Sequence, residues 1–437
     1  MSCTTFAQPL CSHATAQRYW IPKGKATASP ILSVAAACLC ADPEMSDPPQ
    51  HRSRPRLLLL IPHLGGGGAE QVTALLAGGL SPLKYDLHLA VITQSASASA
   101  LVNAPLPPTV TVHPLGAPRV RSSAISLLLL LRRLRPRLII CSMFHLNFLV
   151  LLLRPFLGFR VRILVRQNGT ASAALVPLPR YYRLLYRLLY PLADCVLCQS
   201  AAMTRELHRC CAIPMRRLRV LPNPIDFDAL RTTPPASPET WPDRGPHILA
   251  VGRLSAEKGF DLLLKSLPMV RKRFPFADLV IAGAGREEHA LKTLCQTLAL
   301  DTAVRFPGQV NAPAAYFPTS ALFVLSSYHE GLPNALLEAA ASGLPIVTTR
   351  ASDGLVELVD RHPGVWLAPE STSESLAQTL ITALTELEPG QRFQHTFVEP
   401  FRMNTALAAW EMLIDGFISG APNAAVPARS GSTVASA

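Results

Sequence analysis

ALFVLSSYHEGLPNALLEAAASGLPIV, residues 321–347, tells more about the architecture than any other part of this sequence. Ala321–Leu325 is a short apolar block of strand length, and strong helix formers begin at Ala335. Pro333 suits the first helical position, because proline lacks the N–H that would go unbonded there and its fixed φ matches the turn. A buried strand therefore leads into a helix, which is the unit of sheets covered by helices on both faces.

Two carboxylates flank the start of this helix, Glu330 before it and Glu338 inside it, with seven residues between them. The free N–H groups of the first turn and the positive end of the helix dipole form an anion site. Carboxylates beside such a site can accept hydrogen bonds from hydroxyl groups of the ligand. An ordinary surface helix also carries such acids, so the spacing alone leaves both interpretations open.

Two cations follow another strand-like run, His247–Val251, and precede the helical pattern Phe260–Val270. They are Arg253 and Lys258. Open α/β sheets bind ligands beyond the carboxyl ends of their strands. Arginine can engage phosphate oxygens with two N–H groups, and lysine adds a compact charge beside them.

The two segments together resemble the signature of glycosyltransferase family 4, whose members are retaining enzymes with the GT-B fold. That resemblance implies an α/β protein of two Rossmann-like, doubly wound domains facing each other across a cleft. It implies that Glu330 meets the transferred sugar, that Glu338 meets the donor ribose, and that Arg253 and Lys258 bind the diphosphate. The other donor contacts that it implies are Val310, Gly331, Leu332 and Asn334. Gly283 and Gly285 are donor candidates because they follow the strand-like run Ala277–Ile281, and glycines there permit close backbone approach to a ligand.

A glycine-rich turn follows the strand-like run Leu57–Ile61 and leads into a helix that ends near Leu80. Glycines in this position suggest a phosphate loop. A dinucleotide site is disfavoured, because the next strand, Asp86–Ile92, is not followed by the acid that would hold the ribose. In the resembled family this turn lies under donor and acceptor, which makes Gly67 and Gly68 site candidates.

The acceptor side is less well marked. His145 aligns best with a histidine that many family members place near the reacting carbon, although a lone histidine in an apolar stretch is often structural. Ser142 and Gln167 stand where relatives often have histidine, which leaves acceptor chemistry open. The other strands expected in this half are Val110–His113, Arg137–Cys141, Val161–Val165, Asp194–Cys198 and Leu218–Leu221.

A chain of 437 residues, 49% of them hydrophobic, is long enough for two domains and two cores. We expect an N-terminal acceptor-side domain at 56–231, a proline-rich linker that acts as a hinge at 232–245, and a nucleotide-sugar domain at 246–404. The GT-B resemblance implies that the helix 405–418 returns to the N-terminal domain. Residues 1–55 are expected to be a disordered extension or a misassigned start, in which case residues 1–44 precede the working initiator Met45, and residues 419–437 are expected to be a disordered tail.

Lysine and arginine outnumber the acids by 41 to 29, a net charge of +12, and the N-terminal half interleaves arginine with leucine and tyrosine. This pattern favours contact with an anionic membrane surface, but it also fits a leucine core with solvated arginines. Nucleic-acid binding is disfavoured because no recognised module accompanies the charge. No run of 18 uninterrupted apolar residues is present, which argues against a transmembrane helix.

The ten cysteines form no convincing framework. Cys195 and Cys198 have the spacing of a metal or redox pair, but an odd separation within a strand points them to opposite faces. A zinc site is therefore not expected, and reduced thiols in a cytoplasmic protein are the simplest account. The expected location is the cytoplasm, at the inner face of the cytoplasmic membrane.

The resemblance thus implies a retaining glycosyltransferase that needs no metal or other cofactor. Its donor would be a UDP-, GDP- or ADP-sugar, and its acceptor a sugar or lipid-linked sugar in bacterial polysaccharide or glycolipid biosynthesis. Two alternatives stay open: a GT-B nucleotide-sugar epimerase or hydrolase, and a non-enzymatic protein that binds a membrane surface. The second would explain the basic, leucine-rich segments but not the matching positions of Arg253, Lys258, Glu330 and Glu338.

Overall fold

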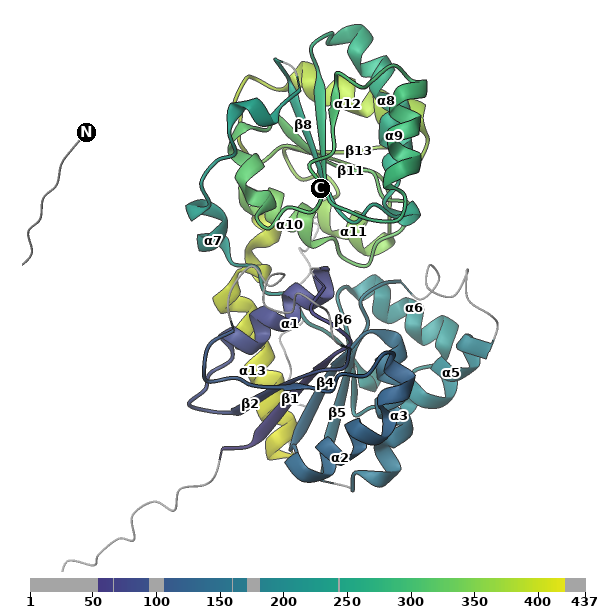
Figure 1. Ribbon diagram of the computed structural model, residues 1–437, viewed down its shortest axis with the longest axis vertical. Helices are drawn as coiled ribbons and strands as arrows, with labels where there is room; N and C mark the ends of the chain where they lie inside the picture. The colour runs from purple at the N-terminus through teal and green to yellow at the C-terminus, as the bar shows by residue number, and fades with distance from the viewer. Residues whose placement is uncertain are drawn as a thin grey trace, which may run out of the picture. The chain divides into compact units, whose positions relative to one another are not determined.

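The computed structural model describes residues 54–93, 106–170 and 181–420, apart from Gly66, Phe159 and Asp243. The expected N-terminal extension, except for its last two residues, and nearly all of the expected C-terminal tail lie outside these ranges. Figure 1 shows two sheets, each flanked by helices, and both belong to one compact unit, residues 53–437.

The first sheet, within the described residues, has seven strands in the order β3-β2-β1-β4-β5-β6-β7, and all of its strand pairs are parallel. The chain order reverses beside β1, and such switch points are where doubly wound sheets bind ligands. The strands are β1 Arg56–Ile61, β2 Asp86–Val91, β3 Thr111–Pro114, β4 Leu138–Ser142, β5 Arg162–Arg166, β6 Cys195–Cys198 and β7 Leu218–Val220.

Helices cover both faces of this sheet, so β1 is apolar almost throughout. Leu58 and Leu60 lie in one core, and Leu57, Leu59 and Ile61 lie in the other. The helices are α1 Gly68–Gly79, α2 Ala124–Leu134, α3 Phe144–Leu153, α5 Tyr181–Leu189, α6 Ala201–Cys211 and α13 Met403–Ser419.

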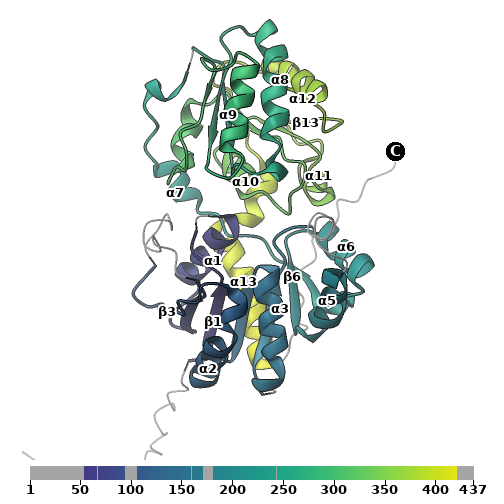
Figure 2. The same cartoon turned by 45° about the vertical axis from the view of Figure 1, so that its right-hand side comes forward.

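The C-terminal helix α13 contributes to the second of these cores through Leu407, Trp410, Leu413, Ile414 and Phe417. The indole Nε1 of Trp410 also donates a hydrogen bond to the carbonyl of Pro222, at 2.9 Å. Both views of the ribbon show α13, in yellow, beside the N-terminal sheet (Figures 1 and 2). The end of the chain therefore completes the core of the domain built from its first half.

The second sheet, again within the described residues, has six parallel strands in the order β10-β9-β8-β11-β12-β13. Its switch point lies between β8 and β11. The strands are β8 His247–Val251, β9 Asp278–Ala282, β10 Val304–Arg305, β11 Leu322–Leu325, β12 Ile346–Thr348 and β13 Val365–Leu367. The helices are α8 Phe260–Arg273, α9 Glu288–Thr297, α10 Asn334–Ala341, α11 Asp353–Val359 and α12 Ser373–Glu386.

Two doubly wound parallel sheets confirm the predicted α/β class, and the predicted strands match the observed ones to within one or two residues. The start of α10 differs slightly, because Pro333 has an extended ψ of 109° and precedes the helix instead of opening it. Between the sheets, the chain forms α7 Phe227–Thr232 and a short 3-10 helix at Pro238–Thr240.

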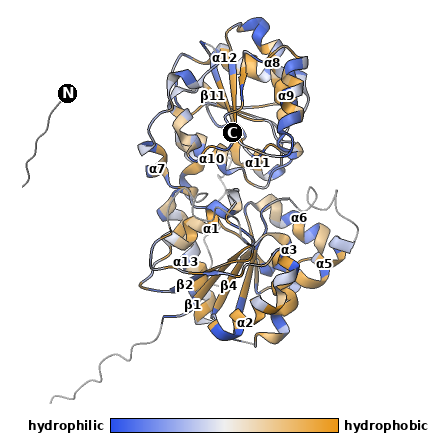
Figure 3. Ribbon diagram, viewed as in Figure 1, coloured by the Kyte–Doolittle hydropathy of each residue, from blue (hydrophilic) through white to orange (hydrophobic). Residues whose placement is uncertain are grey.

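Cys195 and Cys198 lie in different cores of the seven-stranded sheet, which confirms that they point to opposite faces. The apolar residues of the leucine-rich segments are divided between the core and the surface. In α2, for example, Leu127 and Leu131 are buried, whereas Ile125 and Leu129 are exposed. Figure 3 shows the resulting mixture of apolar and polar residues on the helices of this domain. Within the described part of the chain, no helix is both long enough and apolar enough to cross a membrane.

Candidate functional site

The loop after β8 brings a lysine to the end of β11. It contains Arg253 and then a short 3-10 helix, Ala256–Lys258. Gly259 follows with a φ of +60°, and a Cβ atom there would lie 2.1 Å from the carbonyl oxygen of Ser326. Only glycine allows this approach, because it has no Cβ and tolerates positive φ. The hydroxyl of Ser326 donates to the carbonyl of Lys258, at 3.0 Å, and fixes the two loops together.

Lys258 and Glu330 form an ion pair at this junction. Lys258 Nζ lies 2.5 Å from Glu330 Oε1, and the Ser327 hydroxyl donates to the same oxygen at 2.7 Å. The Glu330 side chain is only 10% exposed, so the pair is partly shielded from water. Charge-assisted hydrogen bonds of this kind hold a carboxylate in one orientation. The two residues predicted to meet the sugar and the diphosphate therefore lie side by side.

Glu338 lies in the second turn of α10 and is 9% exposed. Burial raises the pKa of its carboxyl group to about 7, although a hydrogen bond from Gln71 acts in the opposite direction. The Gln71 Nε2 atom of α1 donates this bond to Glu338 Oε1, at 3.0 Å. Glu338 is therefore not a solvated helix residue, and its environment holds the carboxyl group near its titration point at neutral pH.

The start of α10 also contacts the seven-stranded domain. Asn334 Oδ1 accepts a hydrogen bond from Asn223 at 2.8 Å, and Asn334 Nδ2 donates to the carbonyl of Gly68 at 3.2 Å. A Cβ atom on Gly67 would lie 3.4 Å from Nη2 of Arg253. Residues from the β1–α1 turn, the β8 loop and α10 thus gather at one place, as a shared ligand would require.

The glycines after β9 pack against the Arg253 loop. A Cβ atom on Gly283 would lie 1.8 Å from the carbonyl oxygen of Gly252, and one on Gly285 would lie 2.2 Å from that of Leu254. The Gly283 N–H donates to the carbonyl of Gly308, at 2.8 Å. These glycines are therefore needed for loop packing, and their contact with a donor stays a prediction.

Three further predicted donor contacts differ in their surroundings. Leu332 places its side chain in the core, so only its backbone could face a ligand. Val310 is half-buried and packs against the same core. A Cβ atom on Gly331 would lie 2.5 Å from the carbonyl oxygen of Asn168, in the other domain, and 2.6 Å from Gln199 Oε1. Gly331 is thus a site where only a bare backbone fits.

The polar residues at the carboxyl ends of β4 and β5 bond mainly to one another. Arg166 is buried, donates to Asn223 Oδ1 at 2.9 Å and reaches the Ser142 hydroxyl at 3.4 Å. Burial lowers the pKa of its guanidinium group to about 10. Gln167 accepts a hydrogen bond from the Tyr190 hydroxyl, at 3.0 Å. Ser142 and Gln167 therefore have internal partners in this structure.

His145 is the second residue of α3 and follows Met143, whose φ of 81° is unusual for a residue with a side chain. Burial lowers the pKa of the His145 imidazole, and nearby His63 lowers it further. His63 lies in the β1–α1 turn, with its Nδ1 atom 3.3 Å from Glu70 Oε1. Two histidines and a buried acid therefore stand together on the N-terminal side.

Comparisons with known proteins identify the family. The model of the glycosyl transferases group 1 matches residues 245–386, and that of Glycosyltransferase Family 4 matches residues 66–229. The first match covers all the strands of the six-stranded sheet, and the second covers β2–β7 of the seven-stranded sheet. The chain is a group 1 glycosyltransferase that resembles family 4.

Two curated relatives show how far the similarity of this glycosyltransferase extends. An uncharacterized glycosyltransferase of Haemophilus influenzae is 38% identical over 133 residues, which are 30% of this chain and 38% of that protein's length. The N-acetylgalactosamine-N,N'-diacetylbacillosaminyl-diphospho-undecaprenol 4-alpha-N-acetylgalactosaminyltransferase of Campylobacter jejuni is 28% identical over 345 residues, covering 76% of this chain and 90% of the relative.

Solved structures share the fold of the glycosyltransferase. HepE of Anabaena, whose crystal structure is a complex with UDP, has a TM-score of 0.65 at 18% identity and covers 83% of this chain and 100% of its own. Similarity at this level of identity shows the fold alone, and it supports the predicted GT-B arrangement.

Sequence reasoning missed three residues of the glycosyltransferase that lie among the candidates: His63, Glu70 and Gln71. Glu70 and Gln71 belong to the first turn of α1. An acid is common there because it interacts favourably with the positive end of the helix dipole, so Glu70 by itself does not indicate a site. The available signal was their position directly after the glycine-rich turn. Within the described ranges, no three His, Cys, Asp or Glu side chains are grouped so that they could hold a metal ion.

Proposed function

We propose that this glycosyltransferase is a retaining enzyme that moves a sugar from a nucleoside diphosphate donor to a hydroxyl group of its acceptor. The observation that carries the proposal is the Lys258–Glu330 pair beside the start of α10, with Ser327 on the same carboxylate oxygen. A cation, a held carboxylate and free helix N–H groups are the partners that a sugar diphosphate needs.

In the proposed complex, Arg253 and Lys258 bind the diphosphate, and Glu330 accepts hydrogen bonds from the transferred sugar. Glu338 accepts hydrogen bonds from the ribose, for which its carboxyl group must be ionised. The base meets the backbone near Val310. Ligand binding would require Lys258 to share its ammonium group between Glu330 and the phosphate oxygens, which its three N–H donors permit.

The proposed reaction breaks the bond between the anomeric carbon and the diphosphate oxygen and forms a bond from the same face to the acceptor oxygen. The acceptor's proton passes to the leaving diphosphate, through an oxocarbenium-like transition state. Arg253, Lys258 and the N–H groups at the start of α10 stabilise the charge that develops on the diphosphate. His145, with its lowered pKa, stands as a neutral group on the acceptor side.

We take UDP-sugars as the first donors to test, ahead of GDP- and ADP-sugars, because HepE is described in complex with UDP. The name of the Campylobacter relative specifies a diphospho-undecaprenol acceptor, which supports a lipid-linked sugar acceptor for this chain. The setting would then be bacterial polysaccharide or glycolipid synthesis, at an anionic membrane surface. A putative colanic acid glycosyltransferase of Escherichia coli, 30% identical over 183 residues, supports the same setting.

The test starts with thermal shift of the full chain in UDP-, GDP- and ADP-sugars, because a ligand that binds only the folded state raises its stability. We expect one nucleotide class to stabilise the protein, and Arg253→Ala to lose that effect while the exposed surface control Arg361→Ala keeps it. Transfer from the selected donor to lipid-linked acceptors, with NMR assignment of the new anomeric centre, follows. Absence of stabilisation by every nucleotide, or a product of inverted configuration, would refute the proposal.

We also propose that transfer needs no metal ion, since Arg253 and Lys258 can supply the positive charge for the diphosphate. Turnover should be the same in excess EDTA as in magnesium. Activity that disappears in EDTA and returns with magnesium would contradict this part alone.

A further inference from the structure

Helix α5 carries an apolar stripe on its outer side. Tyr181, Leu184, Leu188 and Leu192, which follows the helix, are each between 41% and 59% exposed. Their spacing of three or four residues places them along one side of the helix. The opposite side packs into the core through buried residues such as Tyr186. A helix on a protein surface usually presents polar groups to water, so the outer stripe is unexpected.

Arginines accompany the stripe. Arg183 and Arg187 are exposed on α5 between its apolar residues. Around them the sequence is strongly basic, because residues 119–219 contain eighteen arginines and only two acids, Asp194 and Glu206. Long arginine side chains can lie along an apolar surface and hold their charge at its polar boundary.

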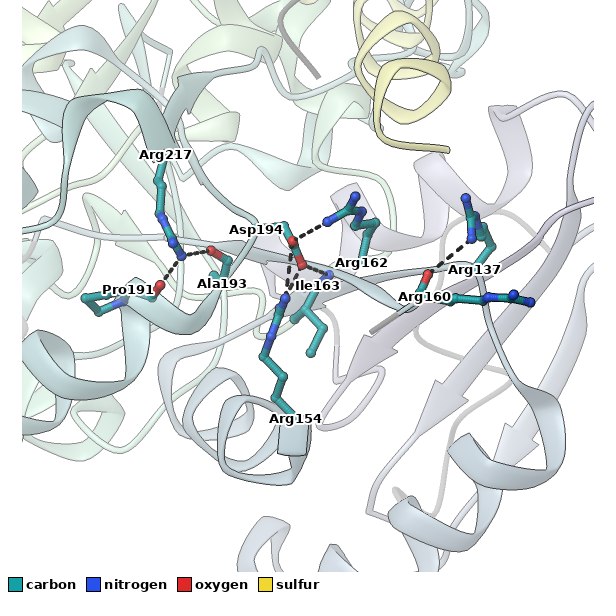
Figure 4. Close-up of polar contacts among 9 residues, drawn as sticks. All are labelled: Arg137, Arg154, Arg160, Arg162, Ile163, Pro191, Ala193, Asp194 and Arg217. Atoms are coloured by element: carbon teal, nitrogen blue, oxygen red, sulfur yellow. Dashed lines mark hydrogen bonds and ion pairs between the residues drawn. The ribbon is translucent and has the colours of Figure 1, made fainter. Parts of the chain in front are cut away.

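A pocket lies where the stripe ends, and it is lined by Arg154, Pro191, Leu192, Asp194, Arg216 and Arg217. Figure 4 shows the polar contacts that organise most of it. Arg154 Nη1 and Arg162 Nη1 donate to the Asp194 carboxylate at 2.7 and 3.1 Å. Arg217 donates to the carbonyls of Pro191 and Ala193, the latter at 2.7 Å.

The charge of this pocket is positive. Burial alone would raise the pKa of Asp194, but hydrogen bonds from Arg154 and from the Ile163 N–H outweigh that effect and lower the pKa. Asp194 is thus a carboxylate at neutral pH, one acid among four arginines, since the exposed Arg216 adds to the other three. An anion with several acceptor oxygens, such as a phosphate, would complement this excess.

Leu192 belongs both to the pocket and to the apolar stripe, so the two features form one surface. This surface lies at the amino ends of β5 and β6, since Arg162 opens β5 and Asp194 directly precedes β6. The candidate active site lies at the carboxyl ends of the strands. The pocket is therefore separate from the donor and acceptor residues described above.

We propose that this surface binds an anionic glycerophospholipid, with the phosphate in the arginine pocket and the stripe of α5 against the acyl region. The glycosyltransferase would thereby dock on an anionic bilayer. Charge complementarity argues for lipid over a second copy of the chain, because two copies meeting here would bring their arginines together. The inference rests on the proposed function only for the lipid-linked acceptor, and it specifies which face of the enzyme meets the membrane.

The test uses the full chain in flotation with vesicles of phosphatidylcholine, alone or with about 30% phosphatidylglycerol. We expect binding to the anionic vesicles, little binding to the neutral ones, and release at about 0.5 M salt, where charges are screened. Leu184→Ser with Leu188→Ser should reduce the bound fraction about tenfold. Leu83→Ser, on an exposed leucine elsewhere in the same domain, is the matched control.

Arg216→Gln tests the pocket without disturbing the bonds around Asp194, and we expect about fivefold weaker vesicle binding. Arg361→Gln, at an exposed arginine of the other domain, should bind as the wild type does. Thermal midpoints of all variants should match that of the wild type. Transfer to a water-soluble acceptor should also be unchanged, which separates failure of docking from failure of the proposed function.

Three outcomes would overturn the inference. The first is equal binding of the wild type to neutral and anionic vesicles, or binding to neither. The second is a wild-type dimer in analytical ultracentrifugation that the Leu184→Ser, Leu188→Ser variant converts to a monomer, which would assign the stripe to self-association. The third is loss of vesicle binding in millimolar inorganic phosphate while millimolar chloride has no effect, which would assign the pocket to free phosphate.

Discussion

The polar residues that follow the strands of the two sheets differ in their exposure. On the six-stranded sheet, Arg253 is exposed and Lys258 half-buried, so a ligand can reach both cations directly. On the seven-stranded sheet, Arg166 and Gln167 are buried and bond to neighbours within their own domain. In the proposed complex the first set meets the donor, whereas the second bonds to other side chains of its own domain. Polar residues near the carboxyl ends of strands in the two sheets thus differ in their surroundings, and the predictions below test whether they also differ in function.

The largest effect should come from Lys258→Ala, which removes the cation next to Glu330. We expect kcat to fall by about a thousandfold, because a single group that stabilises developing charge commonly contributes that much. The thermal midpoint should change little, since the lysine is not part of a core. Lys292→Ala, at an exposed lysine paired with Glu288 on α9, should retain full turnover. Unchanged turnover in Lys258→Ala would remove the donor-side assignment.

Glu338→Gln should abolish a pH dependence of stability. Because burial raises the pKa of Glu338 to about 7, the folded wild type binds a proton that the unfolded chain releases near 4.5. The resulting stabilisation is complete below about pH 4.5 and is lost as the pH rises through about 7, a change on the order of 3 kcal/mol. The free energy of unfolding, measured by denaturant titration from pH 4.5 to 8, should lose this component in Glu338→Gln.

The Glu338 carboxyl group should also make donor affinity depend on pH, but affinity should rise with pH where stability falls. UDP binding to the wild type, followed by calorimetry, should tighten as the pH rises through about 7, because only the ionised carboxylate accepts two ribose hydrogen bonds. Glu338→Gln should show weak binding at all these pH values. A pH profile identical in both proteins would mean that Glu338 does not contact the donor.

Tyr190→Phe tests the internal network of the seven-stranded sheet. The substitution removes the hydroxyl that donates to Gln167, and we expect the free energy of unfolding to fall by about 1.5 kcal/mol. The KM for the donor should be unchanged. The control is Tyr181→Phe, at an exposed tyrosine of α5, which should have no measurable effect on the free energy of unfolding. A large loss of transfer without a loss of stability would place Gln167 in contact with substrate and erase the distinction between the two sheets.

The smallest effect should follow Gln71→Ala, which touches both sheets at once. The Gln71 amide donates to Glu338 and lowers the pKa of that carboxyl group, so its removal should shift the pH midpoint of UDP binding upward. The maximal affinity at high pH should stay close to that of the wild type. A midpoint that moves downward, or not at all, would show that the hydrogen bond is absent in solution.

The strands and the fold class could be predicted because their signals are local, whereas the donor contacts stay predictions. The passage from strand β11 to helix α10 was predicted from a few adjacent residues, with an error of one residue at Pro333. The contact between Gln71 and Glu338 joins residues 267 positions apart, so no periodicity could reveal it. In the same way, the sequence of α5 does not tell which of its leucines are buried, because only packing decides that Leu189 is buried and Leu188 exposed. The burial of Arg166 likewise depends on α13, whose Trp410 ring lies 5.9 Å from the guanidinium carbon.

The return of α13 to the first sheet has a consequence for how the protein is made. The ribosome synthesises β1 long before Trp410, yet both contribute to one core. Domains usually fold in the order of their synthesis, but the core of this first domain lacks α13 until residues 232–419 have been translated, about 20 s at about 10 residues per second. Protease treatment of stalled nascent chains would reveal that interval as a cleavable N-terminal half. The whole second domain is thus translated after the strands of the first domain and before the helix that completes their core.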